Sequence, residues 1–442
     1  MPASYDLIIR NATVASHAGI GPADIGVKDG RTAAIGDLAT ADAGEVIDAS
    51  GLHVLPGVID SQVHFREPGA EHKEDLATGS QAAVLGGVTA VFEMPNTRPS
   101  TTTAEALEDK LKRAAGRMWC DHAFYVGASA ENAQDLADLE QLPGCSGVKM
   151  FMGSSTGDLL VWDDPTVLEV LKHGRRRVAI HAEDEERLKQ RKHLADEGGV
   201  HQHPVWRDEE TALRATTRVL KLAREAGRRI HVLHVTTAEE MALLANHRDI
   251  ATVEVTPQHL TLAAPDCYDR LGTYAQMNPP IREARHRAAL WDAVRAGIVD
   301  VIGSDHAPHT AEEKAKPYPQ SPSGMPGVQT LLPLLLDHMN AGRLSLERLI
   351  DLTSTSAQRI FGIAGKGRLA VGYDADFTVV DLRKSWQIDE KWLASRCGWS
   401  PFAGQDIVGK PIGTIIRGQR VMWEDTLIGA PSGQPVRFQE AL

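Results

Sequence analysis

The middle of the chain, residues 56–364, alternates short apolar segments with longer amphipathic ones. Val88–Phe92 is apolar and rich in β-branched residues, and Thr102–Leu111 then places its apolar residues at helical spacing. Val178–Ile180 and Glu183–Lys189 repeat this order. Strand-like and helix-like periods that alternate indicate parallel strands joined by crossover helices. We therefore predict an α/β fold, a (β/α)8 TIM-like barrel, which needs about 250 residues.

The two chain ends carry a different pattern, in which short apolar runs are separated by turn residues. Such runs predict the strands of small sheets. Residues 1–55 and 365–442 then form either one joint β-sandwich or two unrelated sheets. The runs that predict strands are Asp6–Asn11, Asp24–Arg31, Thr32–Gly36, Gly367–Asp376, Phe377–Asp381 and Gly413–Met422.

The composition, 42% hydrophobic and 24% charged over 442 residues, is that of an ordinary globular protein. A net charge of −12 argues against nucleic-acid binding, which usually needs a basic face. The four cysteines form no CxxC pair, so we expect reduced thiols. The sequence shows neither a signal-peptide pattern nor an apolar run long enough for a membrane span, and we predict a cytoplasmic protein.

Side chains that can bind metal follow the apolar runs of the predicted barrel. His64, His181, His234 and Asp305 each lie at or just after the end of such a run. A barrel places its active site at the carboxyl ends of its strands, so these side chains are expected to converge there. Imidazole and carboxylate suit zinc or a related divalent ion. The alternatives are structural histidines and, for Asp305, a helix cap.

The order His, Lys, His, His, Asp along the chain resembles that of the amidohydrolase superfamily, whose members hydrolyse amides and related bonds. Within it, the chain is most similar to the dihydroorotase branch, which is related to allantoinase and hydantoinase. The resemblance spans nearly the whole chain and implies one joint end domain. The family pattern His-x-His is broken here, because Gln62 replaces the first histidine. The segments that carry the resemblance are His64–Gly69, His72–Asp75, Glu93–Thr97, Val255–Leu260, Asn278–Arg282 and Ser304–His309.

The resemblance implies a metal centre with one or two zinc ions per chain. Its ligands would be His64, Lys149, His181, His234 and Asp305, with Gln62 as a weaker candidate. An ammonium group cannot bind a metal, whereas a lysine carboxylated by carbon dioxide has two oxygens that can bridge two ions. Gly147–Met152 resembles the segment that carries such a lysine. The alternative is a buried Lys149 paired with Asp or Glu.

The replacement of a histidine by Gln62 predicts unequal metal sites. An amide oxygen is a weaker ligand than an imidazole nitrogen. We therefore expect the site of His181 and His234 to bind metal more tightly than the site of His64 and Asp305.

The resemblance also assigns substrate-binding roles by position. Arg66, Asn96 and His309 would hold a free carboxylate, for which a guanidinium is a matched two-pronged donor. A salt bridge of Arg66 with Glu67 or Asp75 is the alternative. The irregular segment 314–327 is expected to line the site. The groups that would hold the amide edges of a ring are Asn278 and the backbone near Ser323 and Gly324.

The implied reaction is the reversible cyclisation of N-carbamoyl-L-aspartate to L-dihydroorotate in pyrimidine biosynthesis, with metal-activated water and Asp305 as general acid and base. A related cyclic amidase, of the allantoinase or hydantoinase type, is the second interpretation. The third is a catalytically silent homologue that serves as a structural partner of aspartate transcarbamoylase. We prefer the first, because Arg66 suits a small-molecule substrate with a free carboxylate and the ligand set is nearly complete. We also expect a homo-oligomer.

Overall fold

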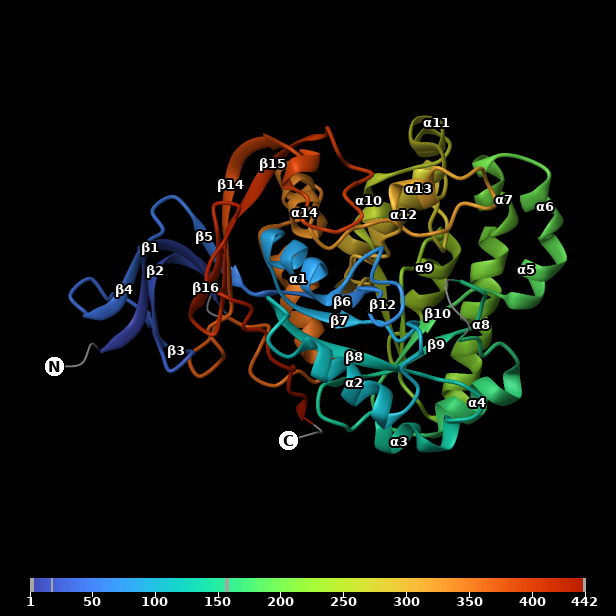
Figure 1. The fold of residues 1–442 in the computed structure, drawn as a ribbon, viewed down its shortest axis with the longest axis horizontal. Coiled ribbons are helices and arrows are strands. Elements are labelled where there is room, and N and C mark those ends of the chain that lie inside the picture. The colour runs from blue at the N-terminus through green and yellow to red at the C-terminus, as the bar shows by residue number, and fades with distance from the viewer. Residues whose placement is uncertain (1–3, 17–18, 156–158, 440–442) are drawn as a thin grey trace.

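The computed structural model describes residues 4–16, 19–155 and 159–439, and it consists of a parallel barrel with a β-sheet at one side (Figure 1). Each barrel strand pairs with the next one along the chain. A parallel bridge between Val63 and His306 joins the last strand region to the first. The predicted α/β barrel is thereby confirmed. Its strands are β6 (Val58–Val63), β7 (Val88–Glu93), β8 (Asp121–Gly127), β9 (Cys145–Phe151), β10 (Val178–His181), β11 (Ile230–Val232), β12 (Ala251–Val255) and β13 (Val301–Ile302).

Helices follow the strands and surround the barrel (Figure 1). Side-chain caps fix where several of them begin, as at Thr103 before α2 and Asp208 before α8. Helix α8 ends at Gly227, which has a left-handed φ of 65°. The helices are α1 (Leu76–Leu85), α2 (Ala104–Ala114), α3 (Leu136–Leu139), α4 (Asp164–Lys172), α5 (Glu185–Arg191), α6 (His193–Asp196), α7 (His203–Trp206), α8 (Glu209–Ala226), α9 (Ala238–Ala245), α10 (Pro257–Thr261), α11 (Asp266–Leu271), α12 (Ala284–Arg295), α13 (Ala311–Lys314), α14 (Leu331–Asn340), α15 (Leu346–Ile350) and α16 (Ser356–Phe361).

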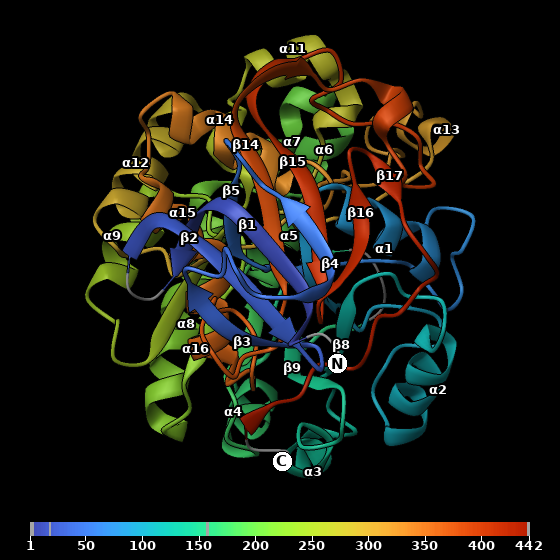
Figure 2. The same cartoon turned by 90° about the vertical axis from the view of Figure 1, so that its left-hand side faces the viewer.

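The second sheet contains strands from both chain ends, which lie side by side in Figure 2. Strand β5 pairs with β1 on one side and with β14 on the other. Side chains from both ends share one apolar core, in which Ile9 and Val14 lie with Phe377 and Val379. The end domain is therefore joint. Its strands are β1 (Tyr5–Ser16), β2 (Gly19–Lys28), β3 (Arg31–Gly36), β4 (Ala43–Asp48), β5 (His53–Pro56), β14 (Phe377–Gln387), β15 (Asp406–Ile416), β16 (Gln419–Trp423) and β17 (Thr426–Leu427).

The strand predicted at Gly367–Asp376 is wrong. Gly367 and Gly372 have φ angles of 80° and 89°, which produce turns instead of an extended run. An isolated bridge between Arg31 and Asp374 and a few backbone hydrogen bonds, such as Thr32 N to Tyr373 O at 2.9 Å, connect this segment to the sheet. Residues 1–3 and 440–442 of the predicted end domain lie outside the described part of the chain.

Hydrogen bonds of threonine hydroxyls connect the sheet of the end domain to the barrel. Thr378 Oγ1 donates to Gly87 O at 2.7 Å and accepts from Val58 N at 3.2 Å. Thr414 Oγ1 donates to Val84 O at 2.7 Å. These contacts fix the start of β6, the strand that leads into the first candidate ligands. Within the described ranges, no helix has both the length and the apolar character to cross a membrane, and all four cysteines are buried and unpaired.

Candidate active site

The predicted site residues surround one cavity at the carboxyl ends of the barrel strands. Gln62 lies in β6 and Lys149 in β9, His181 ends β10, and His234 and Asp305 follow β11 and β13. Of the predicted residues, only His309 is not in direct contact with the cavity. The lining consists of Gln62, His64, Arg66, Asn96, Lys149, Phe151, Ser155, His181, His234, Asn278, Asp305, Ala307, Ser323 and Gly324.

One pair of candidate ligands is formed by His64 and Asp305. His64 Nε2 lies 3.2 Å from Asp305 Oδ1, and the Gln62 amide nitrogen donates to the same oxygen at 3.0 Å. The other ring nitrogen of His64 is bonded to Asn96 Oδ1 at 2.8 Å, which fixes the ring. Burial lowers the pKa of His64 to about 4, so the imidazole is neutral and has a lone pair.

The second pair is formed by His181 and His234, whose nitrogens Nδ1 and Nε2 lie 3.1 Å apart. Burial lowers the pKa of both imidazoles. His181 Nε2 is bonded to Glu183 Oε2 at 2.8 Å, and Arg207 Nε donates to Glu183 Oε1 at 3.0 Å. A carboxylate that fixes the far nitrogen of a histidine is a usual support for a metal ligand.

Lys149 is buried without an acidic partner. Its Nζ has no hydrogen-bond partner among the described residues, and it lies 4.5 Å from the centre of the Phe151 ring. Burial lowers the pKa of Lys149 to about 7, which makes a neutral, reactive amine accessible near neutral pH. Within the described part of the chain, the alternative ion pair of Lys149 with Asp or Glu is therefore not formed.

These residues fit a binuclear centre only if Lys149 contributes oxygen ligands. Among the described residues, no three His, Cys, Asp or Glu side chains are grouped closely enough to hold a metal. The candidate ligands form two pairs instead, His64 with Asp305 and His181 with His234. Lys149 lies close enough to both pairs for its charge to contribute to the lowered pKa values of the three histidines. A carbamate on Lys149 would complete both pairs. Gln62 Oε1 is a further candidate ligand, because it is buried and has no hydrogen-bond partner among the described residues.

The backbone at this site is strained. Arg66, His234 and Asp305 have φ angles of 63°, 37° and 45°, a region that residues other than glycine rarely adopt. Such conformations persist where surrounding structure imposes them, and they are enriched in active sites. Here these backbone conformations direct three functional side chains at the strand ends toward one cavity.

Arg66 is buried, and its nearest polar neighbours are neutral groups. Its Nε donates to Pro308 O at 3.1 Å, and its Nη2 lies 3.3 Å from His309 Nε2. Burial lowers the pKa of Arg66 to about 10. The alternative salt bridges are not formed, because Glu67 is bonded to Arg117 and Asp75 to Arg396.

The groups expected to hold a ring amide are partly engaged within the protein. Asn278 Nδ2 donates weakly to Ser155 Oγ at 3.4 Å. Gly324 N donates to Gln276 O at 2.9 Å, so that this N–H is not available to a ligand. A side chain at Gly324 would clash with Ala307 O, 2.5 Å from the Cβ position, which explains the glycine. Ser323 O accepts from His309 Nε2 at 3.0 Å.

Sequence reasoning missed several residues of the site. Glu183, Phe151, Ser155 and Ala307 were not assigned a role. The spacing His181-x-Glu183 was a usable signal for the supporting carboxylate, and despite burial Arg207 holds the pKa of Glu183 well below its usual range. Nothing in the local sequence marks Ser155 or Ala307, which reach the cavity only through the fold.

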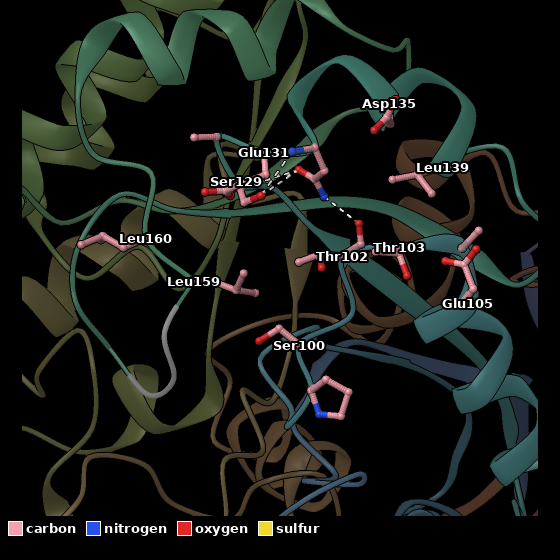
Figure 3. Close-up of a pocket in the computed structure, with 14 residues that line it drawn as sticks. Ser100, Thr102, Thr103, Glu105, Ser129, Glu131, Asp135, Leu139, Leu159 and Leu160 are labelled. Carbon is pink, nitrogen blue, oxygen red and sulfur yellow. Dashed lines mark hydrogen bonds between the residues drawn. The ribbon is translucent and has the colours of Figure 1, made fainter.

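Two further hollows lie near this end of the barrel. One, of about 580 Å³, opens beside Arg66 and is lined by basic groups that include His72, Lys73 and Arg98. The other, of about 840 Å³, lies between the start of α2 and the segment after β8 (Figure 3). Its lining has carboxylates and leucines, but no three potential ligands among the described residues are grouped closely enough to hold a metal.

Comparison with known proteins agrees with this geometry. Residues 53–421 match the model of the Amidohydrolase family, and residues 1–54 match that of the Urease alpha-subunit, N-terminal domain. The chain belongs to the amidohydrolase family and is a metal-dependent hydrolase. Enzymes of this family and the hydantoinase structures generally use a binuclear metal centre with a carboxylated lysine.

Relatives with different substrates are about equally similar. A dihydroorotase of Halobacterium salinarum is 38% identical over 436 residues, which cover 97% of this chain and 99% of that protein. An allantoinase of Rubrobacter xylanophilus is 36% identical and covers 99% of this chain and 98% of its own. The structure of an L-hydantoinase from Arthrobacter aurescens superimposes with a TM-score of 0.92 at 32% identity, over 98% of this chain and 99% of that one. Cyclic amide hydrolysis is the common activity.

Proposed function

We propose that the protein is a dihydroorotase, which interconverts N-carbamoyl-L-aspartate and L-dihydroorotate. The observation that carries the proposal is the environment of Arg66. This buried cation lines the cavity, and within the described chain it donates to a carbonyl and lies 3.3 Å from an imidazole nitrogen. A buried charge without a counter-charge is unfavourable. The free carboxylate of dihydroorotate would neutralise it, whereas allantoin and simple hydantoins have no carboxylate.

The approach to the cavity supports an anionic substrate. Lys73, His72 and Arg98 line the hollow beside Arg66, with Glu313 as the acidic group. Lys73 Nζ lies 3.1 Å from His309 Nδ1 and 3.1 Å from Glu313 Oε1. A basic entrance of this kind raises the local concentration of anions. The local positive charge offsets the repulsion between an anionic substrate and a chain of net negative charge.

The residues of the cavity divide the chemical tasks. Arg66, with Asn96 and His309 beside it, would orient the substrate carboxylate, and Asn278 would bind the amide edge of the ring. A divalent metal held by the two histidine-containing pairs and a Lys149 carbamate would lower the pKa of bound water and polarise the amide carbonyl. Asp305 would accept the proton of the attacking water and return it to the leaving nitrogen. In ring closure the same carboxylate would take the proton from the carbamoyl nitrogen.

The test is turnover by the metal-loaded protein. It should open dihydroorotate at mildly alkaline pH and close N-carbamoyl-aspartate at mildly acidic pH, and it should leave allantoin and hydantoin unchanged. Preferential turnover of allantoin or hydantoin would identify a related cyclic amidase instead. No turnover of any of these compounds would favour a silent homologue, and co-elution with aspartate transcarbamoylase would then be the next measurement.

A further inference from the structure

The amino ends of two neighbouring barrel strands carry a cluster of arginines that catalysis does not use. Arg175, Arg176 and Arg177 precede β10, and Arg229 precedes β11. Together with Arg359 they line a cavity of about 200 Å³ that contains no acidic side chain in its lining. Because β10 and β11 are parallel and end at His181 and beside His234, this cavity lies at the opposite end of the barrel from the active site. We call it the arginine cavity.

The acidic residues near the arginine cavity are engaged by other arginines. Glu140 is paired with Arg228 at 2.8 Å, and Asp300 with Arg248 at 2.6 Å. Arg175, Arg177 and Arg229 have no carboxylate within 4.0 Å in the described part of the chain.

Arg359 is the arginine of this group that has a carboxylate nearby. Its Nη1 lies 4.0 Å from Asp351 Oδ1. Asp351 is itself held by Arg348 at 2.5 Å. The charges of Arg175, Arg177 and Arg229 are therefore not balanced by a carboxylate of the described residues, in a protein whose net charge is −12.

Buried side chains form the floor of the arginine cavity, so the cavity is more than a group of surface arginines. Arg176 is 8% exposed, donates to Cys145 O at 2.6 Å and lies 4.8 Å from the centre of the Phe438 ring. Ser146, which is 2% exposed, also lines the cavity, and its hydroxyl has no hydrogen-bond partner among the described residues. Burial, together with the charge of Arg229, lowers the pKa of Arg177 to about 10. Both observations favour an anionic ligand in this cavity.

We propose that the arginine cavity binds a small, multiply charged phosphate group, either free or as part of a phosphate ester. Guanidinium groups present paired N–H donors that match phosphate oxygens, and several of them are needed to balance two or more negative charges. The Ser146 hydroxyl adds a neutral donor. The small volume and the apolar Phe438 wall favour a compact ligand over a polymer. The site is independent of the reaction proposed above.

The test is binding of inorganic phosphate, pyrophosphate and a nucleoside monophosphate to the full-length, metal-loaded protein. Isothermal titration and thermal unfolding would be measured against sodium chloride of matched ionic strength. The Arg229→Gln variant should weaken binding roughly tenfold or more, the usual effect of losing one charge-assisted hydrogen bond. Ser146→Ala should weaken it less. Arg214→Gln is the matched control, because Arg214 is an exposed arginine on α8 paired with Glu210.

The outcomes separate the possibilities. Stabilisation by phosphate or pyrophosphate that is lost in Arg229→Gln and kept in Arg214→Gln supports the proposal, and tighter binding of the nucleotide would identify a phosphate ester as the ligand. Equal effects of phosphate and chloride would overturn it. A change of oligomeric state in Arg229→Gln without a change in phosphate binding would also overturn it, because the cluster would then be a subunit contact.

Discussion

Changing Gln62 to histidine tests how this site departs from its family. In the structure the Gln62 amide nitrogen donates to Asp305 Oδ1 at 3.0 Å, while its oxygen has no hydrogen-bond partner among the residues that the structure describes. Gln62 and His64 lie two residues apart on the same strand end and therefore point to the same side. An imidazole at position 62 would add a nitrogen ligand next to His64 Nε2, which lies 3.2 Å from Asp305.

The expected magnitude follows from two opposing effects. Losing the amide hydrogen bond to Asp305 costs about 1 kcal/mol, and removing the unpaired buried oxygen recovers a similar amount. A first-shell ligand should change metal affinity at least as much as the 10–100-fold that is typical of supporting residues, or about 1.4–2.8 kcal/mol. Gln62→His should therefore raise occupancy of the weaker site with little net change in folding stability. Activity need not rise, because the pocket is adapted to the amide.

The assay is metal content per chain under limiting zinc, together with chelator competition, for wild type and Gln62→His. Gln258→His is the control, because Gln258 is buried with an unpaired Oε1 but does not line the cavity. Equal stoichiometry and equal affinity in wild type and Gln62→His would show that residue 62 does not face the metal. An increase in both histidine variants would point to adventitious binding.

The remaining predictions concern the ligands, the substrate cation and one helix cap. Lys149→Ala should lose most metal and activity, and short carboxylic acids should restore part of both; wild-type metal content in this variant would exclude the carbamate. Metal analysis should find about one to two divalent ions per chain, and activity that survives complete chelation would contradict a metal-dependent reaction. Arg66→Met should weaken the transition-state complex by about 2–4 kcal/mol in kcat/KM, with little change in Tm, and an unchanged kcat/KM would reopen the allantoinase and hydantoinase interpretations. Burial raises the pKa of Asp208, but the hydrogen bonds from Arg187 and Thr211, together with the charge of Arg191, outweigh burial and hold the pKa at about 2. Since this is below its ordinary value, the stabilisation is present above about pH 4 and lost as the pH falls through about 2. Asp208→Asn should cost about 1–2 kcal/mol at neutral pH and flatten the acid limb of stability, measured by urea unfolding, and identical pH profiles would refute the assignment.

The barrel and the convergence of the candidate ligands could be predicted from the sequence, because strand and helix periods alternate and polar residues follow the strands. His181 and His234 are examples, since each follows a short apolar run. The turns in Gly367–Asp376 could not be predicted, because the apolar residues of this segment follow a strand-like pattern while its glycines adopt positive φ.

Contacts made through tertiary structure were beyond the sequence. The carboxylate of Glu240 accepts from the hydroxyls of Thr237 and Thr216, at 2.8 Å each, and so links α9 to α8. Likewise, no local pattern shows that Gly324 N is already bonded to Gln276 O or that Ser155 reaches the cavity. These contacts depend on which strands and loops become neighbours.

The sheet shared by both chain ends imposes an order on biosynthesis. Val58 N bonds to Thr378, 320 residues further along the chain, and β5 has no β14 to pair with until that segment has been made. At about 5–20 residues per second, the first strands wait roughly 15–60 s on the ribosome with an apolar edge open to other chains. Such long-range pairing is slow and exposed to aggregation. Nascent chains of this protein are therefore expected to depend on chaperones, and losing the C-terminal strands should leave the N-terminal ones without a folded partner.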